Sequence, residues 1–198
     1  MKYSFISANG HSRDTLKITR LMLTRLFSYC QVMHSFLDFI SVFGLQEKPR
    51  DIRFSSFREQ NLVSRPDPSL ASPILGRSER QYQLCYNLKS VGRYEKSWST
   101  RQAAIYHQFD VNGNAVWIIT QGHWDIKDRI ADMTGVRGRE RDRKFGKVFE
   151  CFRSSLSVHL LLCEWSIENW RFYLQSLEDS IEKEVWAYQF CSPWQVTD

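Results

Sequence analysis

The densest set of groups that could bind or react lies in one predicted strand, residues 101–111. This strand holds Arg101, Gln102, His107 and Asp110 among apolar residues. Their side chains favour an interior hydrogen-bond network, because buried polar groups need partners. The alternative is a contact with a small polar ligand or a neighbouring subunit. No Ser or Cys nucleophile is patterned with His107, which argues against catalysis. We therefore treat these four as candidate binding residues and predict no catalytic residue.

A second candidate site consists of Asp125, Asp128 and Asp132, in a segment that predicts a short helix over 123–133. Their spacing of three and four residues places the three carboxylates on one helical face. Such a cluster could bind Mg²⁺ or Ca²⁺ with the help of water. Acids near a helix start also stabilise the helix dipole without any ligand. The segment is therefore a candidate metal site, with Mg²⁺ as the ion to test and no cofactor required.

The chain has 198 residues and a formal net charge of +5, and its densest basic stretch is the segment 135–147. The cations there are Arg137, Arg139, Arg141, Arg143, Lys144 and Lys147. Dense like charge with three interspersed glycines predicts a mobile, solvent-exposed loop. The alternative is a surface from Arg137 to Lys147 for an anionic membrane or a phosphate group. No nucleic-acid-binding motif accompanies these cations, which argues against nucleic acid as a partner.

Five cysteines are scattered along the chain without a Cys-x-x-Cys pair: Cys30, Cys85, Cys151, Cys163 and Cys191. Most of them lie within apolar patterns, which predicts buried thiols in a reducing compartment rather than disulfides or zinc ligands. The sequence also lacks the common phosphate-loop, dinucleotide, zinc-protease and hydrolase motifs. We therefore predict that the chain is not an enzyme.

A long helix is predicted over 15–43, because apolar residues recur there every three or four positions. Gly44 and Pro49 suit its end. The segment 46–80 is polar and rich in Ser, Arg and Pro, which predicts an irregular connection with a short strand near 51–57.

Alternating apolar and polar residues predict a half-buried strand over 81–91. A hairpin follows, because the turn Asn112-Gly113-Asn114 separates two strand-forming runs, 101–111 and 115–120. The run 115–120 is apolar on both faces, as in a strand that is central in its sheet or covered on both sides. We therefore expect an antiparallel sheet of at least three strands.

The segment 145–188 has a strong helical period. Unbroken, it would extend for about 66 Å, so a break near 154–155 or 164–166 is expected in a compact domain. Its apolar and acidic surface would serve self-association or the docking of a protein partner. The residues predicted to be buried are Leu26, Met33, Leu37, Ile105, Phe109, Trp117, Ile119, Leu156, Cys163 and Trp170.

Together these elements predict an α/β (α+β) fold, in which an antiparallel sheet is flanked by long helices. The length suits a single domain over 1–198, with an irregular segment at 46–80 and a basic loop at 135–147. Residues 1–13 lack the apolar core of a signal peptide, and no apolar run approaches the about 20 residues of a membrane span. We expect a cytoplasmic location, with the membrane periphery as the alternative.

Three stretches resemble the CorA-like transporter domain of filamentous fungi. They are 26–39 (LFSYCQVMHSFLDF), 97–122 (SWSTRQAAIYHQFDVNGNAVWIITQG) and 162–170 (LCEWSIENW), which runs on to Leu177 and Glu178. These stretches occur in the family's order and cover roughly 20 to 180 of the chain. The resemblance implies a fold like the cytoplasmic α/β/α domain of CorA-type magnesium channels, without the transmembrane helices. The Gly-Met-Asn signature of the pore is missing, so the resemblance does not carry ion conduction to this chain.

The resemblance implies a non-enzymatic domain that serves the assembly of a divalent-cation transporter or senses the ion. One alternative is a free-standing fungal interaction or effector-type module that has lost transport. A small-ligand-binding protein or an enzyme is the weaker alternative. These functions require different surfaces. An assembly domain or an interaction module needs an association surface, whereas a ligand-binding protein or an enzyme needs an enclosed polar pocket.

Overall fold

The computed structural model describes residues 3–9, 16–43, 54–75, 78–94, 97–121, 125–144 and 146–191. Their centre is a five-stranded sheet with the strand order β1-β5-β4-β3-β2. Three pairings are antiparallel, whereas β1 runs parallel to β5. The bounds of the strands are Tyr3–Asn9 (β1), Phe57–Asn61 (β2), Gln81–Tyr94 (β3), Ser97–Asp110 (β4) and Ala115–Gln121 (β5). The predicted α+β fold and its antiparallel strands are confirmed.

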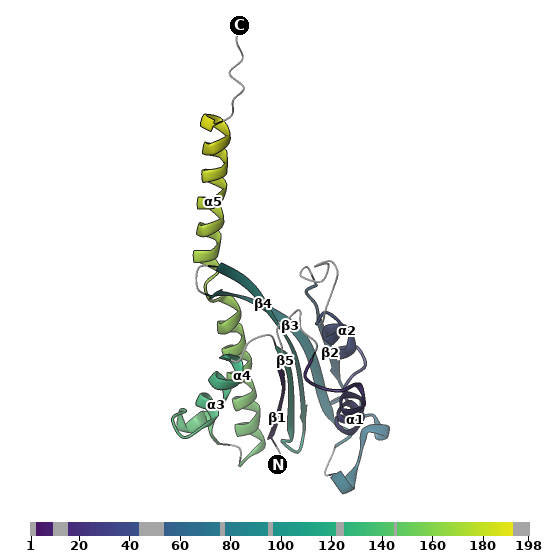
Figure 1. Cartoon of the computed structure of the whole chain (residues 1–198). Helices are drawn as coiled ribbons and strands as arrows, with labels where there is room; N and C mark the ends of the chain where they lie inside the picture. Colours follow the sequence, from purple (N-terminus) through teal and green to yellow (C-terminus); the bar gives the residue numbers. More distant parts are fainter. Residues whose placement is uncertain are drawn as a thin grey trace.

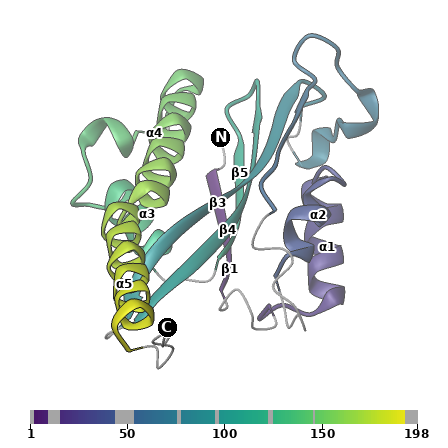
Figure 2. The ribbon, with the colours of Figure 1, turned by 90° about the horizontal axis from the view of Figure 1, so that it is seen from above.

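Helices cover both faces of the sheet (Figures 1 and 2). On one face lie α1 (Arg20–Cys30) and α2 (Phe36–Ser41), and on the other lie α3 (Asp125–Thr134) and α4 (Val148–Ile167). The last helix, α5 (Trp170–Cys191), extends past the end of the sheet. Short 3₁₀ turns connect these elements at Pro68–Leu70 (η2), Pro73–Leu75 (η3) and Glu140–Asp142 (η4).

The predicted β4–β5 hairpin forms at the Asn-Gly-Asn turn. Asp110 Oδ1 accepts hydrogen bonds from the amides of Asn112 and Asn114, both at 2.9 Å. Asp110 Oδ2 accepts a third from Asn114 Nδ2 at 2.8 Å. Gly113 has a φ of 80°, which a residue without a Cβ adopts at little cost. The turn thus sets the register that pairs Phe109 with Ala115.

The single long helix predicted over 15–43 is wrong, because the chain breaks between α1 and α2. Gln31 lies in the left-handed region with a φ of 53°, which ends α1. The buried side chain of Gln83, on β3, satisfies the broken backbone: its Oε1 accepts from the Met33 amide at 3.0 Å, and its Nε2 donates to the Gln31 carbonyl at 3.3 Å. A contact from the sheet, some fifty residues away, therefore stabilises the break.

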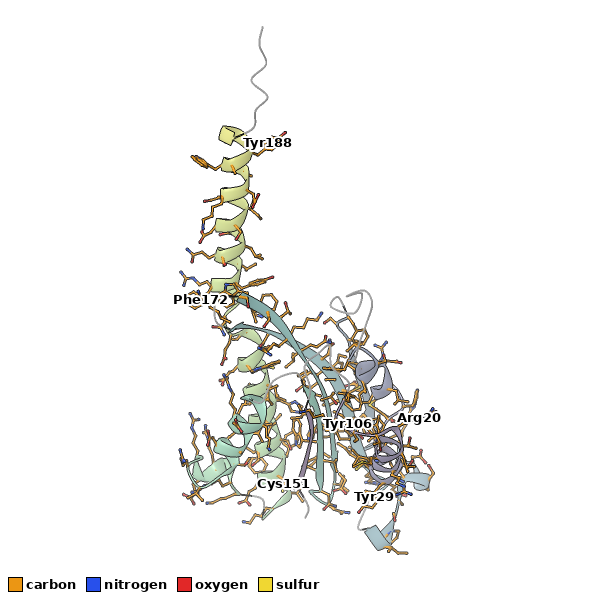
Figure 3. All side chains as sticks on the ribbon, viewed as in Figure 1. Arg20, Tyr29, Tyr106, Cys151, Phe172 and Tyr188 are labelled. Carbon is orange, nitrogen blue, oxygen red and sulfur yellow. The ribbon has the colours of Figure 1, made fainter. Side chains whose placement is uncertain are left out.

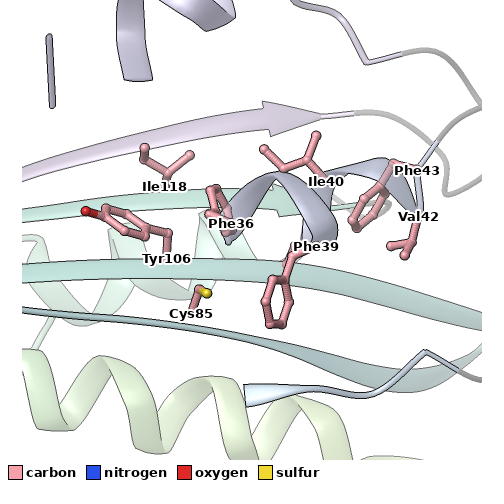
Figure 4. Packing of buried hydrophobic residues seen from close by; sticks show 9 residues of the cluster. Phe36, Phe39, Ile40, Val42, Phe43, Cys85, Tyr106 and Ile118 are labelled. Atoms are coloured by element: carbon pink, nitrogen blue, oxygen red, sulfur yellow. The ribbon is translucent and has the colours of Figure 1, made fainter. Parts of the chain in front are cut away.

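The break lets α2 lie flat on the sheet. Its Phe36 packs against Tyr106 of β4 with ring centroids 5.3 Å apart (Figure 4). Phe39 meets Phe54 edge-on, with ring centroids 5.3 Å apart. Ile118 of β5 completes this side of the core. The opposite side is centred on Trp117 and Ile105, which are covered by α3 and α4.

The predicted core is partly right. Four of its residues are buried in the sheet: Ile105, Phe109, Trp117 and Ile119. Three are half-buried: Leu26, Met33 and Trp170. Three predictions are wrong, because the side chains are exposed: Leu37, Leu156 and Cys163. Leu37 is exposed because the helix break changes the phase of α2, so that Phe36, Phe39 and Ile40 face the sheet instead.

The C-terminal helical segment is also interrupted, as expected, and the break lies close to the second of the two predicted positions, 164–166. The break lies at Glu168 and Asn169, and Asn169 has a φ of 64°. Ser154 and Ser155, one of the two predicted break points, are buried in the middle of α4. Their small side chains let α4 approach the sheet closely, and Ser155 Oγ donates to the Cys151 carbonyl at 3.0 Å.

The remaining elements lie near their predicted positions. The helix predicted over 123–133 is α3, although residues 123 and 124 lie outside the described residues. The strand expected near 51–57 is β2, which begins only at Phe57, and residues 51–53 again lie outside the described residues. Within the basic segment, the described arginine and lysine side chains are exposed and η4 forms one 3₁₀ turn. The mobility of this segment stays a prediction.

Candidate association surface

The helix α4 carries two apolar rows on opposite sides. The inner row is buried against the sheet and consists of Cys151, Ser154, Ser155, Val158, Leu162 and Trp165. The outer row is exposed, and we name it the α4 stripe: Phe149, Leu156, Leu160, Cys163 and Ile167. Phe152 lies between the two rows, and its partly exposed ring packs edge-on against Phe109 of β4 with centroids 5.8 Å apart. At 3.6 residues per turn the two rows lie roughly 160° apart around the helix axis. Leu156 and Cys163 were predicted to be buried because they share the helical period of the α4 stripe, but that stripe faces away from the sheet.

The helix α5 carries a second exposed row, which we name the α5 stripe: Leu174, Leu177, Ile181, Val185 and Tyr188. The steps of three and four residues keep these side chains on one side of the helix. Tyr188 is 78% exposed and lies on the part of α5 that extends beyond the sheet (Figure 3). An amphipathic helix normally buries such a row against another element. Among the described residues, however, no element covers either stripe.

The base of α5 is fixed to the sheet, so that its direction is set by packing. Asn169 Nδ2 donates to the Val91 carbonyl of β3 at 3.2 Å. Tyr173 packs against Trp98 of β4 with ring centroids 5.9 Å apart. These contacts hold the first turn of α5 at the end of the β3–β4 hairpin, and the rest of the helix projects from there.

The break between α4 and α5 is also tied to α3. Arg129 of α3 donates through both terminal nitrogens to the carboxylate of Glu168, with Nη2 to Oε2 at 2.8 Å. A two-point guanidinium–carboxylate contact fixes orientation as well as distance. The exposed stripes are therefore presented by a framework that three elements hold in place.

The four candidate binding residues of the 101–111 strand are not brought together. Strand alternation places Arg101 and His107 on the α4 side of β4, and Gln102 and Asp110 on the other side. Gln102 Nε2 donates to the Val42 carbonyl after α2 at 3.2 Å, and Asp110 forms the hairpin turn. Residues six positions apart, as Arg101 and His107 are, lie roughly 20 Å apart along a strand. A ligand contact by any of them stays a prediction.

His107 belongs to a buried polar chain that links the sheet to α4. Tyr86 Oη lies 2.7 Å from His159 Nδ1, and His159 Nε2 lies 3.1 Å from His107 Nδ1. The His107 ring stacks on Trp117 with centroids 3.9 Å apart. One consistent arrangement has both imidazoles neutral with the proton on Nε2, so that Tyr86 donates to His159 and His159 donates to His107. The chain is suited to fixing α4 on the sheet.

Burial shifts the pKa values of the three side chains in this hydrogen-bonded chain. It lowers the pKa of His107 well below its usual value, and the neighbouring His159 lowers it further. Burial also lowers the pKa of His159 to about 4. The pKa of the Tyr86 hydroxyl is raised by burial, with a smaller effect of Cys163. All three groups are therefore neutral near pH 7. The sequence indicated that His107 needed a partner but could not identify Tyr86 or His159.

The opposite face of β4 holds a second buried polar network. Tyr106 Oη lies 2.9 Å from Gln83 Oε1 and 3.0 Å from Gln108 Oε1. Gln108 Nε2 donates to Gln81 Oε1. Because Gln83 also holds the α1–α2 break, this network connects the sheet to the helices above it. Its partners come from two strands, and sequence spacing alone could not pair them.

The candidate metal residues lie on α3. The side chains of Asp128 and Asp132 are exposed, and that of Asp125 lies outside the described residues. Among the residues that the structure does describe, no three His, Cys, Asp or Glu side chains are grouped as metal ligands. A Mg²⁺ site at these positions stays a prediction.

Cys163 corrects the expectation of buried thiols, because its side chain is exposed on the α4 stripe. Cys30, Cys85 and Cys151 are buried as expected, and burial raises the pKa of Cys85 to about 11. The side chain of Cys191 lies outside the described residues.

Comparison with known proteins agrees with the resemblance found in the sequence. The family profile described as CorA-like transporters matches residues 1–188. A search of curated proteins finds no significant match. Within the described part of the chain, no helix has both the length and the apolarity needed to cross a membrane. The profile spans nearly the whole sequence, and the chain therefore belongs to the CorA-like transporter family.

Proposed function

We propose that the chain is a non-enzymatic assembly domain of the CorA-like family, which associates with further copies of itself through the α4 and α5 stripes. The observation that carries this proposal is the second apolar face of α4, which lies opposite the face packed on the sheet. Members of the family oligomerise, which supports self-association over binding of an unrelated protein. The proposal places the chain in the assembly of a divalent-cation transporter, with Mg²⁺ as a modulator at most.

The size of the stripes supports a stable contact. Their side chains together expose on the order of 1,000 Å², whereas a standard interface buries about 800 Å² per partner. Each stripe contributes roughly half of this area, and exposed apolar patches larger than a few hundred Å² are rare on monomers and mark interaction sites. The hydrophobic effect would therefore favour covering both stripes.

The charges of α5 are compatible with contact between two copies. By helical spacing, Asp179 and Lys183 project from the side opposite the α5 stripe, whereas Glu178 and Glu184 flank it. Packing one α5 stripe against another keeps Asp179 and Lys183 apart and leaves Glu178 and Glu184 at the rim of the contact, where water screens their charges. In a symmetric contact the same patch serves both partners, so no second kind of surface is needed.

Size-exclusion chromatography with light scattering tests this proposal through two matched variants. Leu177→Glu with Ile181→Glu places two charges on the α5 stripe, and we expect it to give a monomer where the unmodified chain is oligomeric. The control, Gln175→Glu with Ala187→Glu, adds the same charge to exposed positions of α5 away from the stripe and should leave the oligomer intact.

Equal masses for the unmodified chain and the stripe variant would contradict self-association through α5. If the unmodified chain stays monomeric but a purified protein partner binds it and loses affinity for the stripe variant, the free-standing interaction module is the better explanation. The same masses with and without millimolar Mg²⁺ would remove the ion as a modulator.

A further inference from the structure

The η4 turn and the first part of α4 form an open concavity of about 600 Å³ at the end of α4 remote from α5. It is lined by Arg139, Glu140, Arg141, Lys144 and Arg153. Four of these side chains are cationic and one is acidic, so the concavity carries excess positive charge. The sequence indicated a basic loop, but only the fold adds Arg153 from α4 to it.

The positive charge is only partly neutralised. Lys144 Nζ contacts Glu140 Oε1 at 2.7 Å, and this contact lowers the pKa of the Glu140 carboxyl. The guanidinium of Arg141 lies 3.9 Å from Asp142, beyond hydrogen-bond distance. Within the described residues, no acceptor or carboxylate meets the guanidinium of Arg139. At least two arginine side chains are therefore available to an anion.

Arg153 is held in place while one of its donors remains unused. Its Nη2 donates to the Arg141 carbonyl at 3.0 Å, and its guanidinium lies 5.9 Å from the centroid of the Phe149 ring. Its Nε is buried without a hydrogen-bond partner among the described residues. A buried donor without an acceptor is costly, and an anion in the concavity could supply one.

Two hydrogen bonds hold the wall of the concavity in place without using the guanidinium groups of Arg139 and Arg141. Asp142 is buried and accepts a hydrogen bond from Ser157 of α4 at 2.8 Å. Arg143 Nη1 donates to the Val136 carbonyl at 3.1 Å. The first bond fixes η4 against α4, and the second ties the end of η4 to the segment after α3. Binding an anion therefore need not order the whole segment.

From this geometry we propose that the concavity binds a phosphate group, through Arg139, Arg141 and Arg153. Guanidinium groups present paired N–H donors that match the oxygens of phosphate. The phosphate could be carried by a soluble phosphorylated compound or by a lipid headgroup, and the chemistry of recognition is the same for both. The site lies away from the α5 stripe and does not depend on self-association through it.

Isothermal titration calorimetry with inorganic pyrophosphate tests binding in solution. Arg139→Ala with Arg141→Ala removes two lining side chains, and we expect the affinity to fall at least about tenfold. The matched control, Arg137→Ala with Arg171→Ala, removes the same net charge from exposed positions outside the concavity and should change the affinity less than about threefold.

A second variant, which should raise the affinity instead of lowering it, keeps the test decisive even if the double arginine variant folds poorly. Glu140→Gln removes the one carboxylate among the described lining residues and frees Lys144, so pyrophosphate should bind several-fold more tightly. Glu178→Gln makes the same change of net charge on α5 and should have no effect on the affinity.

Sedimentation with vesicles identifies the source of the phosphate. Vesicles of phosphatidylcholine with phosphatidic acid are compared with vesicles of phosphatidylcholine alone, using the same four variants. Binding that depends on Arg139 and Arg141 in the vesicle arm, without affinity for pyrophosphate, supports the site and assigns it to a lipid headgroup. Absence of binding in both arms, or equal losses in the site and control variants, would overturn the proposal.

Discussion

The buried chain of Tyr86, His159 and His107 makes the stability of the fold dependent on pH. Protonation of His107 at Nδ1 would place a second donor against the Nε2–H of His159, at the 3.1 Å contact between these rings. Protonation of His159 would place a charge in a largely apolar layer between β4 and α4. The folded state therefore resists protonation, whereas the unfolded chain does not.

The sign follows from the pKa values. The usual value for histidine is 6.5, and the folded value for His159 is about 4. The unfolded state therefore binds more protons between these values, and stability falls as the pH falls from about 6.5 to about 4. For His159 alone, linkage gives a loss of about 2 kcal/mol between pH 7 and pH 5. His107 adds to the loss in the same direction, because its pKa is also lowered.

Urea unfolding at a series of pH values between 7 and 5 measures this loss. The unmodified chain should lose at least about 2 kcal/mol over this range, and His159→Gln should lose clearly less because no imidazole remains at that position. His34→Gln is the matched control, because His34 is exposed, and it should keep the full dependence. An unchanged pH dependence in His159→Gln would refute the assignment of this effect to the buried chain.

Three further predictions concern packing and the association surface. Gln83→Leu should cost about 1–3 kcal/mol in urea unfolding, because it leaves the backbone groups at the α1–α2 break without partners. Equal stability would show that the break does not need the sheet. Trp117→Ala should cost about 3–5 kcal/mol and Trp170→Ala about 1–2 kcal/mol, because Trp117 is fully buried and Trp170 only half-buried. Thermal melts that reverse this order would contradict the burial of the two rings. Alkylation of Cys163, followed by peptide mapping, should slow as the protein concentration rises, because self-association covers the α4 stripe. A rate independent of concentration would place Cys163 outside the interface.

Local sequence patterns predicted the sheet well, because its strands are defined by short-range chemistry. Asn112-Gly113-Asn114 is suited to a turn with a positive φ, and Asp110 has the side chain to accept from the turn amides. The apolar character of 115–120 on both faces correctly indicated a central strand covered on both sides. β5 lies between β1 and β4, its Ile118 packs in the core on the α2 side, and its Trp117 and Ile119 pack in the core on the α3 and α4 side. In each case the deciding residues are close together in the chain.

The errors arose where distant residues decide the structure. No Gly or Pro marks the end of α1, and the break at Gln31 depends on Gln83 of β3. The period of α4 gave two apolar rows, but the period alone does not tell which row meets the sheet. Ser154 and Ser155 indicated a break by composition, whereas in the fold they allow close packing of α4. The polar partner of His107 is likewise 52 residues away, on α4.

The candidate sites likewise combine features that neighbouring residues determine with features that depend on residues distant in the chain. The basic character of 135–147 was evident from the sequence, but the concavity exists only because Arg153 of α4 lies beside η4. The polar residues of β4 were recognised as unusual, yet strand alternation separates them onto two faces. Proximity across elements, rather than residue type, is what the sequence could not supply.

Sedimentation velocity of the unmodified chain over a series of concentrations tests self-association most directly. We predict a sedimentation coefficient that rises with concentration and a dominant oligomer at tens of micromolar, because burial of the α4 and α5 stripes favours association. A single monomeric species at every concentration, with and without millimolar Mg²⁺, would contradict the proposed assembly function.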